Sequence, residues 1–130
     1  MREILFKAKR LDNGEWVQGY YYQIWEKGYI LWGMTNNMPD MVEVNPDTLC
    51  QSTGLTDKNG KKIWENDIVN RTDLHVVSEP SIGFIEYDLE NTSFLIHWTN
   101  KVEYSPTYHW KDKLQVIGNI FDNAELLEVE

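Results

Sequence analysis

The sequence predicts an all-β protein that begins with an antiparallel meander, with helix confined to a short turn near the C-terminus. Three observations support this fold class. Apolar and polar residues alternate with a period of two in successive segments, as they do in strands with one buried face. Pairs such as Asn13-Gly14 mark tight turns between those segments. Aromatic residues, which favour strands, make up 13% of the 130 residues.

The N-terminal part of the chain reads as three strands joined by local turns. Gly19, inside the second of these segments, indicates a bulge or a bend. We expect strands over residues 2–10, 15–25 and 29–34, separated by turns at 12–14 and 26–28.

The rest of the chain carries further strand and turn signals. Residues 35–40 indicate a loop, and residues 57–60 fit a type I turn with Gly60 at positive φ. Asn123 is expected to cap a helical turn over residues 122–127. The other expected elements are strands at 41–44, 67–71, 82–88, 93–98 and 114–120 with a bulge at Gly118, a 3₁₀ turn at 47–49, and a loop over 99–113 with room for a short edge strand.

The clustering of aromatic residues is the strongest functional signal. Seven of them fall between residues 16 and 32: Trp16, Tyr20, Tyr21, Tyr22, Trp25, Tyr29 and Trp32. Side chains alternate along a strand, so Tyr20 and Tyr22 share one face, and Tyr21 and Trp25 share the other. One small domain covers only one such face easily. We therefore expect Tyr20, Tyr21, Tyr22 and Trp25 to bind protein, either a second copy of this chain or a different protein.

Other interpretations of this cluster stay open. Exposed aromatic rings also stack on sugars or on nucleic-acid bases. A well-filled core with ordinary surface tyrosines would explain the same residues without any binding role.

The charge distribution disfavours a general nucleic-acid binder. The chain has 21 acidic and 12 basic residues, a formal net charge of -9, and such a chain repels the phosphate backbone. The first ten residues are the exception, because Arg2, Lys7, Lys9 and Arg10 outnumber Glu3. A nucleic-acid-binding small barrel is therefore our second hypothesis.

No set of residues predicts catalysis. The soft metal ligands Cys50, His75, His97 and His109 lack the spacing of a zinc site, and Cys50 has no activating motif around it. We expect no metal, no cofactor and no enzymatic activity.

The nearest approach to a catalytic motif is a pair of carboxylates. Glu86 and Asp88 share one face of a strand, as Mg²⁺ ligands in nucleases do. Simple alternation explains the pair as the solvated face of a hairpin, with Ile85, Tyr87 and Leu89 facing inward. A metal-dependent hydrolase is our third hypothesis.

The single cysteine and the hydropathy favour a reducing cytoplasm. Cys50 has no second cysteine with which to form an internal disulfide. No apolar run approaches the roughly 18 residues that span a bilayer, and Met1–Ile4 does not begin a signal peptide. We expect a cytoplasmic protein with no membrane contact.

Two long motifs resemble one protein family. They are Gln51–Val69, which contains Gly54-Leu55-Thr56-Asp57 and Glu65-Asn66-Asp67-Ile68-Val69, and Val116–Leu127. Together with the opening Arg2–Ala8, they are similar to the YopX family of phage and prophage proteins. Asn66 stands where the family usually has Gly, and Ala124 where it often has Pro. Both residues suit the local turn and helix start.

The resemblance implies a fold and an origin but no activity. It implies an SH3-like small barrel over residues 51–130, which follows the aromatic meander over residues 1–50. It also implies a phage or prophage accessory protein of unassigned function, present in the cytoplasm of a host bacterium. Together with the aromatic cluster, this favours a non-catalytic protein that binds itself or a host or phage protein.

Overall fold

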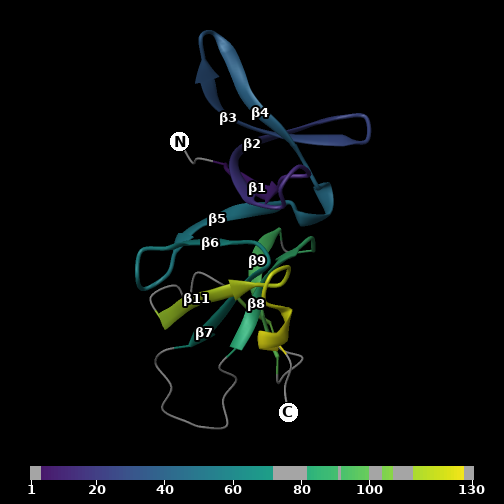
Figure 1. Cartoon of the computed structure of the whole chain (residues 1–130). Coiled ribbons are helices and arrows are strands. Elements are labelled where there is room, and N and C mark those ends of the chain that lie inside the picture. The colour runs from purple at the N-terminus through teal and green to yellow at the C-terminus, as the bar shows by residue number, and fades with distance from the viewer. Residues whose placement is uncertain (1–3, 72–81, 91, 100–103, 107–112, 128–130) are drawn as a thin grey trace. The chain divides into compact units, whose positions relative to one another are not determined.

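A computed structural model describes residues 4–71, 82–90, 92–99, 104–106 and 113–127. The chain divides into two compact units, Met1–Ser52 (unit 1) and Thr53–Glu130 (unit 2). The strands pair antiparallel, and the only helices among the described residues are short 3₁₀ turns (Figure 1). The predicted all-β class is therefore confirmed.

Unit 1 is a meander of four strands, followed by the start of a fifth. The strands are β1 (Phe6–Lys9), β2 (Trp16–Ile24), β3 (Lys27–Thr35), β4 (Met38–Val44) and β5 (Cys50–Thr56), in the spatial order β4-β3-β2-β1-β5. The first residues of β5 pair with β1. The 3₁₀ turn η1 (Pro46–Thr48) precedes β5 and begins at Asn45, whose side-chain oxygen accepts a hydrogen bond from the Asp47 N–H at 3.0 Å. The predicted 3₁₀ turn in this region is thus confirmed.

The prediction of a loop over residues 35–40 is wrong. Strand β3 runs on to Thr35 and β4 begins at Met38, so only Asn36 and Asn37 form the turn. Both asparagines have positive φ, 53° and 65°, which Asn tolerates in a two-residue hairpin turn. Pro39 fits within β4 because β4 is an edge strand, where a missing N–H is tolerated.

Gly19 marks the point at which β2 changes its neighbour. Trp16–Gly19 pair with β1, whereas Tyr20–Ile24 pair with β3. A Cβ atom at Gly19 would lie 2.2 Å from the carbonyl oxygen of Leu31, so only glycine allows β3 to approach this closely.

A small apolar cluster forms the core of unit 1. Ala8, Ile30 and Val44 are buried, and partly buried apolar side chains pack against them, namely Phe6, Val17, Tyr21, Val42 and Leu49. Backbone hydrogen bonds join the end of β1 to the end of β4, including Asn45 N–H to Lys9 O at 2.8 Å. The sheet therefore curls around this core.

Unit 2 contains a five-stranded antiparallel sheet in the order β10-β9-β8-β7-β11. Its elements are β6 (Lys62–Trp64), β7 (Asp67–Arg71), β8 (Ile82–Asp88), β9 (Ser93–Trp98), β10 (Tyr104–Pro106), β11 (Leu114–Asn119) and the 3₁₀ turn η4 (Ala124–Leu127). The register shifts between Val116 and Gly118, which confirms the predicted bulge. Strand β10 lies at the sheet edge, where the sequence left room for a short strand.

The core of unit 2 is larger than that of unit 1. Its buried members are Ile63, Val69, Ile85, Ile96, Trp98, Leu114 and Val116. Leu55 and Phe94 pack against this cluster. Leu89, expected to face inward, is 82% exposed because it lies in the turn after β8.

Two turns of unit 2 have the predicted backbone. Gly60 has a φ of 82°, and its N–H donates to the carbonyl oxygen of Asp57 at 3.0 Å. Asn66 has a φ of 71°, so Asn does serve at the left-handed position where the family usually has Gly.

The C-terminal helical turn is confirmed as η4, and Asn123 directly precedes it, with its backbone carbonyl oxygen accepting the Leu126 N–H at 2.9 Å. The side-chain oxygen of Asn123 accepts the N–H of Asn119 at 3.2 Å, so it points back toward β11. The side-chain oxygen of Asn119 accepts the N–H groups of Phe121 and Asp122, in the turn that precedes η4.

Candidate protein-binding surface

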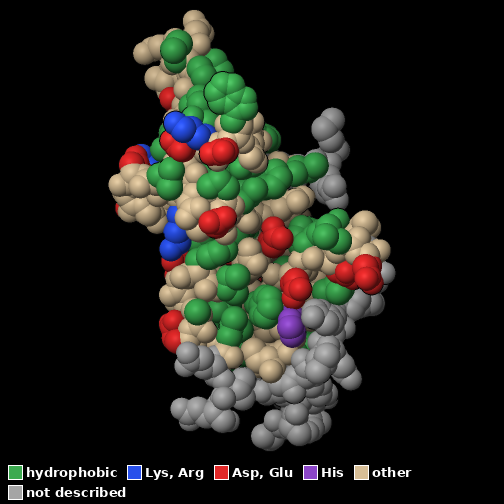
Figure 2. All heavy atoms as spheres, turned by 90° about the vertical axis from the view of Figure 1, so that its right-hand side faces the viewer, with side chains coloured by type: hydrophobic (Ala, Val, Ile, Leu, Met, Phe, Trp, Pro, Cys, Tyr) green, Lys and Arg blue, Asp and Glu red, His purple; other side chains and the backbone are tan. Residues whose placement is uncertain are grey.

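The face of β2, β3 and β4 that points away from the unit 1 core is largely apolar. The register aligns Tyr20 with Leu31 and Met41 across the three strands, and Tyr22 with Tyr29 and Glu43 in the next row. We call the following six side chains the outer face: Tyr20, Tyr22, Ile24, Tyr29, Leu31 and Met41. Figure 2 shows hydrophobic side chains on the upper part of the molecule, where the N-terminal hairpins lie, with charged side chains among them.

Contacts within the outer face hold its side chains in place. The rings of Tyr22 and Tyr29 stack with centroids 5.3 Å apart and an interplanar angle of 18°. The hydroxyl of Tyr22 donates to the Sδ of Met41 at 3.1 Å. Tyr20 remains 56% exposed, and Ile24 and Met41 are exposed as well. The face is therefore ordered and accessible.

Tyr21 lies on the opposite face and belongs to the core. Its ring packs against Phe6 with centroids 6.0 Å apart, and it covers the backbone at Gly28. Of the four residues predicted to bind protein, Tyr21 therefore contributes to folding rather than to the outer face.

Trp25 lies in a turn and not on a strand face. Strand β2 ends at Ile24, and Trp25 and Glu26 form a two-residue turn before Lys27. The sequence placed this turn at 26–28 because Gly28 looks like a turn residue, whereas Gly28 pairs within the sheet. Trp25 is 92% exposed, and its φ is 56°.

The β2–β3 turn also borders a hollow. The side chains around this hollow of ≈ 560 Å³ are Ile24, Trp25, Glu26, Lys27 and Tyr29. The Nε2 of Gln23 donates to the carbonyl oxygen of Trp25 at 2.8 Å and fixes the turn. Ile24 and Tyr29 belong both to this hollow and to the outer face, so the two features are continuous.

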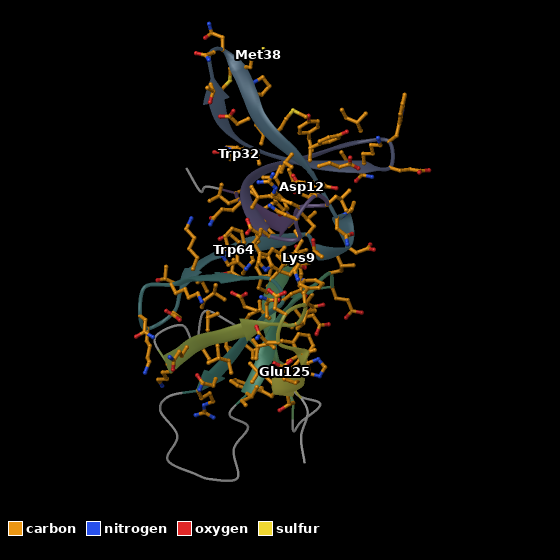
Figure 3. The ribbon with its side chains drawn as sticks, in the orientation of Figure 1. Lys9, Asp12, Trp32, Met38, Trp64 and Glu125 are labelled. Carbon is orange, nitrogen blue, oxygen red and sulfur yellow. The ribbon has the colours of Figure 1, made fainter. Side chains whose placement is uncertain are left out.

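The far end of the β3–β4 hairpin is apolar too. Trp32, Met34 and Met38 are exposed there, and Trp32 falls at the register shift between Leu31 and Gly33 (Figure 3). Methionine side chains adapt to irregular surfaces, which suits a binding role. The four predicted binding residues do not include Tyr29, Leu31 or Met41, although Tyr29 belongs to the aromatic cluster and its alternation with Leu31 is visible within residues 29–34.

The basic N-terminal strand is engaged with an aromatic ring. The Nζ atoms of Lys7 and Lys9 lie 4.7 and 5.5 Å from the ring centroid of Trp16. These cation–π contacts hold both ammonium groups beside the indole.

The candidate catalytic residues have structural contacts. Glu86 Oε2 lies 3.2 Å from His97 Nδ1, and Asp88 Oδ1 accepts the Glu90 N–H at 3.1 Å. Within the part of the chain that the structure describes, no three His, Cys, Asp or Glu side chains are placed to hold a metal ion. Cys50 is buried, and its Sγ lies 3.3 Å from the carbonyl oxygen of Thr48. His75 and His109 lie outside the described residues.

One buried carboxylate has a structural explanation. Burial raises the pKa of Asp57, but hydrogen bonds from the N–H groups of Val116, Lys61 and Asn59, each 2.9 Å long, lower it further than burial raises it. The nearby charge of Lys61 acts in the same direction. The net effect is a lowered pKa, so Asp57 serves as an ionised clamp between its turn and β11.

The fold and surface together define an all-β protein of two units, the first of which displays an ordered apolar face. The family model described as YopX protein matches residues 5–128, and the chain belongs to this family.

Comparisons with individual proteins add the fold alone. The crystal structure of protein EF1440 from Enterococcus faecalis is similar, with a TM-score of 0.60 and 23% identity over 98% of this chain and 100% of that chain. No curated protein matches. In the described part of the chain, no helix has the length and hydropathy to cross a membrane.

Proposed function

We propose that this chain is a phage or prophage accessory protein that acts without catalysis, by binding another protein through its outer face. The observation that carries the proposal is the ordered apolar face of β2, β3 and β4. An isolated domain rarely exposes a continuous apolar patch of this kind without a binding role.

The chemistry of the face suits protein recognition. Tyrosine and tryptophan are enriched at the energetic centres of interfaces, because they bury a large area for few rotatable bonds. The stack of Tyr22 on Tyr29 and the bond from Tyr22 to Met41 restrict these side chains before any partner binds. Less conformational entropy is then lost on association.

The carboxylates of β8 support binding over hydrolysis. A metal-dependent hydrolase would need Glu86 and Asp88 to turn toward a common ion. Glu86 instead lies beside His97, and Asp88 caps its own turn through the Glu90 N–H.

Affinity capture tests the proposed binding role. Tagged parent chain, a Tyr20→Ser/Met41→Ser variant and a Leu89→Ser control are used to capture proteins from nuclease-treated lysate of a bacterial host that also expresses the untagged parent chain. Leu89 is a matched control because it is a large exposed apolar residue of unit 2. We expect the parent and the control to retain the same protein, a second copy included, and the double variant to lose it. Identical sets for all three chains would refute a binding role for the outer face.

Nucleic-acid binding is the second candidate, and the arrangement of Lys7, Lys9 and Trp16 favours it. Two ammonium groups beside a half-buried indole are the elements of a stacking site for a base next to a phosphate. An electrophoretic shift at low salt, abolished by Lys7→Ala/Lys9→Ala, would support this candidate. Mobility of the nucleic acid unchanged by the parent chain would eliminate it.

A further inference from the structure

We infer that the protein bound is a second copy of this chain, with Trp25 of each copy inserted into the hollow beside Trp25 of the other. This inference rests on the proposed function and names its binding partner. We call residues Ile24–Lys27 together with Tyr29 the tip.

The backbone at Trp25 is the first observation behind this inference. A two-residue hairpin turn usually has Gly, Asn or Asp at a position with positive φ, and a bulky residue there is rare. Trp25 combines a φ of 56° with 92% exposure. Its backbone conformation is therefore strained, and its indole gains no burial in the folded chain. Strained residues of this kind concentrate where a surface is used for binding. The hydrogen bond from Gln23 keeps the tip ordered.

The shape of the tip is self-complementary. The exposed indole forms one wall of an open hollow of ≈ 560 Å³, whose other walls include Ile24 and Tyr29. Sites that enclose small ligands have volumes of roughly 300–1,000 Å³, so an indole ring fits. A two-fold axis brings the same patch of two molecules together, and each protrusion then meets the hollow of the other copy.

The charges of the tip are self-complementary as well. Glu26 and Lys27 are neighbours at the turn, and a two-fold axis can oppose Glu26 of one copy to Lys27 of the other, twice. Unit 1 as a whole is nearly neutral, with five basic and seven acidic residues. Unit 2 has seven basic and fourteen acidic residues. Repulsion between copies is therefore weakest for a contact made by unit 1.

A stable dimer must bury more surface than the tip alone offers, so the contact must include part of the outer face. One tryptophan buries about 150–250 Å². A stable interface buries about 800 Å² on each partner. The contact must therefore spread from the tip across Ile24 and Tyr29 to Tyr20 and Met41, the exposed part of the outer face.

Sedimentation of the full chain at micromolar concentrations tests the inference. We expect a mass of about twice 15.4 kDa. Trp25→Ser should raise the dissociation constant at least about tenfold, and Leu89→Ser should leave it unchanged. Glu26→Lys and Lys27→Glu should each weaken the dimer, and the double exchange Glu26→Lys/Lys27→Glu should restore it. Circular dichroism of each variant confirms that it is folded.

Each possible failure has its own meaning. The chain could be a monomer at all concentrations while its outer face still captures a different protein from the lysate. This result would overturn the inference that the partner is a second copy, and it would leave the proposed function standing. A dimer that neither Trp25→Ser nor the charge exchange affects overturns the reciprocal insertion. If Tyr20→Ser/Met41→Ser changes neither the dissociation constant of the dimer nor the capture of a protein from the lysate, the proposed function is overturned as well.

Discussion

Unit 1 and unit 2 are both antiparallel β structures, but they place their large apolar side chains differently. The buried apolar cluster of unit 2 has seven members, all with large side chains, whereas that of unit 1 has three, one of which is Ala8. Among the described residues, ten large apolar side chains are exposed, and nine of them belong to unit 1. These nine are Ile4, Leu11, Tyr20, Ile24, Trp25, Trp32, Met34, Met38 and Met41, and Leu89 is the exception in unit 2.

The contrast separates stability from recognition. Unit 2 has the apolar core and the buried Asp57 clamp, which are features of a stable scaffold. Unit 1 presents four aromatic residues, Tyr20, Tyr22, Trp25 and Tyr29, on the outer face and at the tip, which are features of a binding module. The acidic charge of the chain lies mainly in unit 2, which leaves unit 1 free to make apolar contacts.

A matched pair of core truncations tests the difference in core size. Ile85 in unit 2 and Ile30 in unit 1 are both fully buried. We expect Ile85→Ala to lower the free energy of unfolding by about 3–4 kcal/mol and Ile30→Ala by about 2 kcal/mol, since the smaller cluster collapses more easily around a cavity. Urea unfolding followed by circular dichroism measures both values. Equal losses would show that the two cores are equivalent.

A second prediction concerns the crossing of β2 and β3, on which the outer face depends. Gly19→Ala should cost about 3 kcal/mol, because the new Cβ would lie against the Leu31 carbonyl oxygen and force β3 away. Gly33→Ala is the control, since its Cβ would have a nearest neighbour at 3.7 Å, an ordinary contact. Thermal unfolding compares them. A Gly19 variant as stable as the Gly33 variant would contradict the register of β2.

The fold was largely predictable because turn chemistry is local. The Asp57–Gly60 turn, the bulge at Gly118 and the 3₁₀ turn after Asn45 follow from residues next to one another. The β2–β3 turn was not predictable in this way. Gly28 signals a turn, but a side chain there would collide with the ring of Tyr21, whose Oη would lie 2.5 Å from the new Cβ. A packing requirement between strands placed Gly28 inside the sheet.

The candidate surface was predictable only in part. Alternation correctly separates Tyr20 and Tyr22 from Tyr21, but it does not say which face meets the core. That choice depends on Ala8 and Val44, which are far from Tyr21 in sequence and pack beside it. The exposure of Trp25 depends on a turn of two residues. If this turn is placed one residue away, the side chains of the strand are assigned to the opposite faces of the sheet.

The Asp57 clamp predicts how stability depends on pH. A carboxyl with a lower pKa in the folded than in the unfolded state stabilises the fold above the unfolded value, about 3.9. This contribution is lost as the pH falls from about 4 through the folded pKa. Asp57→Asn should therefore cost about 2 kcal/mol near neutral pH, and less in acid. Urea unfolding at several pH values measures the difference, and a constant difference would refute the clamp.

The turn that contains this aspartate gives a smaller expected effect. Gly60→Val should lower the free energy of unfolding by about 1–2 kcal/mol, because a β-branched residue is strained at a φ of 82°. No heavy atom lies within 4 Å of the position of a new Cβ, so the cost comes from the backbone and not from a clash. Gly60→Asn should recover most of the loss, since Asn tolerates positive φ. Equal stability of the Val variant and the parent would exclude this explanation.

The smallest expected effect separates the surface of unit 1 from its core. Tyr20→Ser should change the free energy of unfolding by less than about 0.5 kcal/mol when measured on dilute monomer, as Leu89→Ser should, because both side chains are mostly exposed. Tyr21→Ser should cost several times more, since the Tyr21 ring packs on Phe6 and the unit 1 core. The same Tyr20→Ser chain should nevertheless lose affinity for its binding partner, whereas Leu89→Ser should retain it. A Tyr20 variant that lost stability as Tyr21→Ser does would mean that the outer face is part of the fold and not a surface kept for binding.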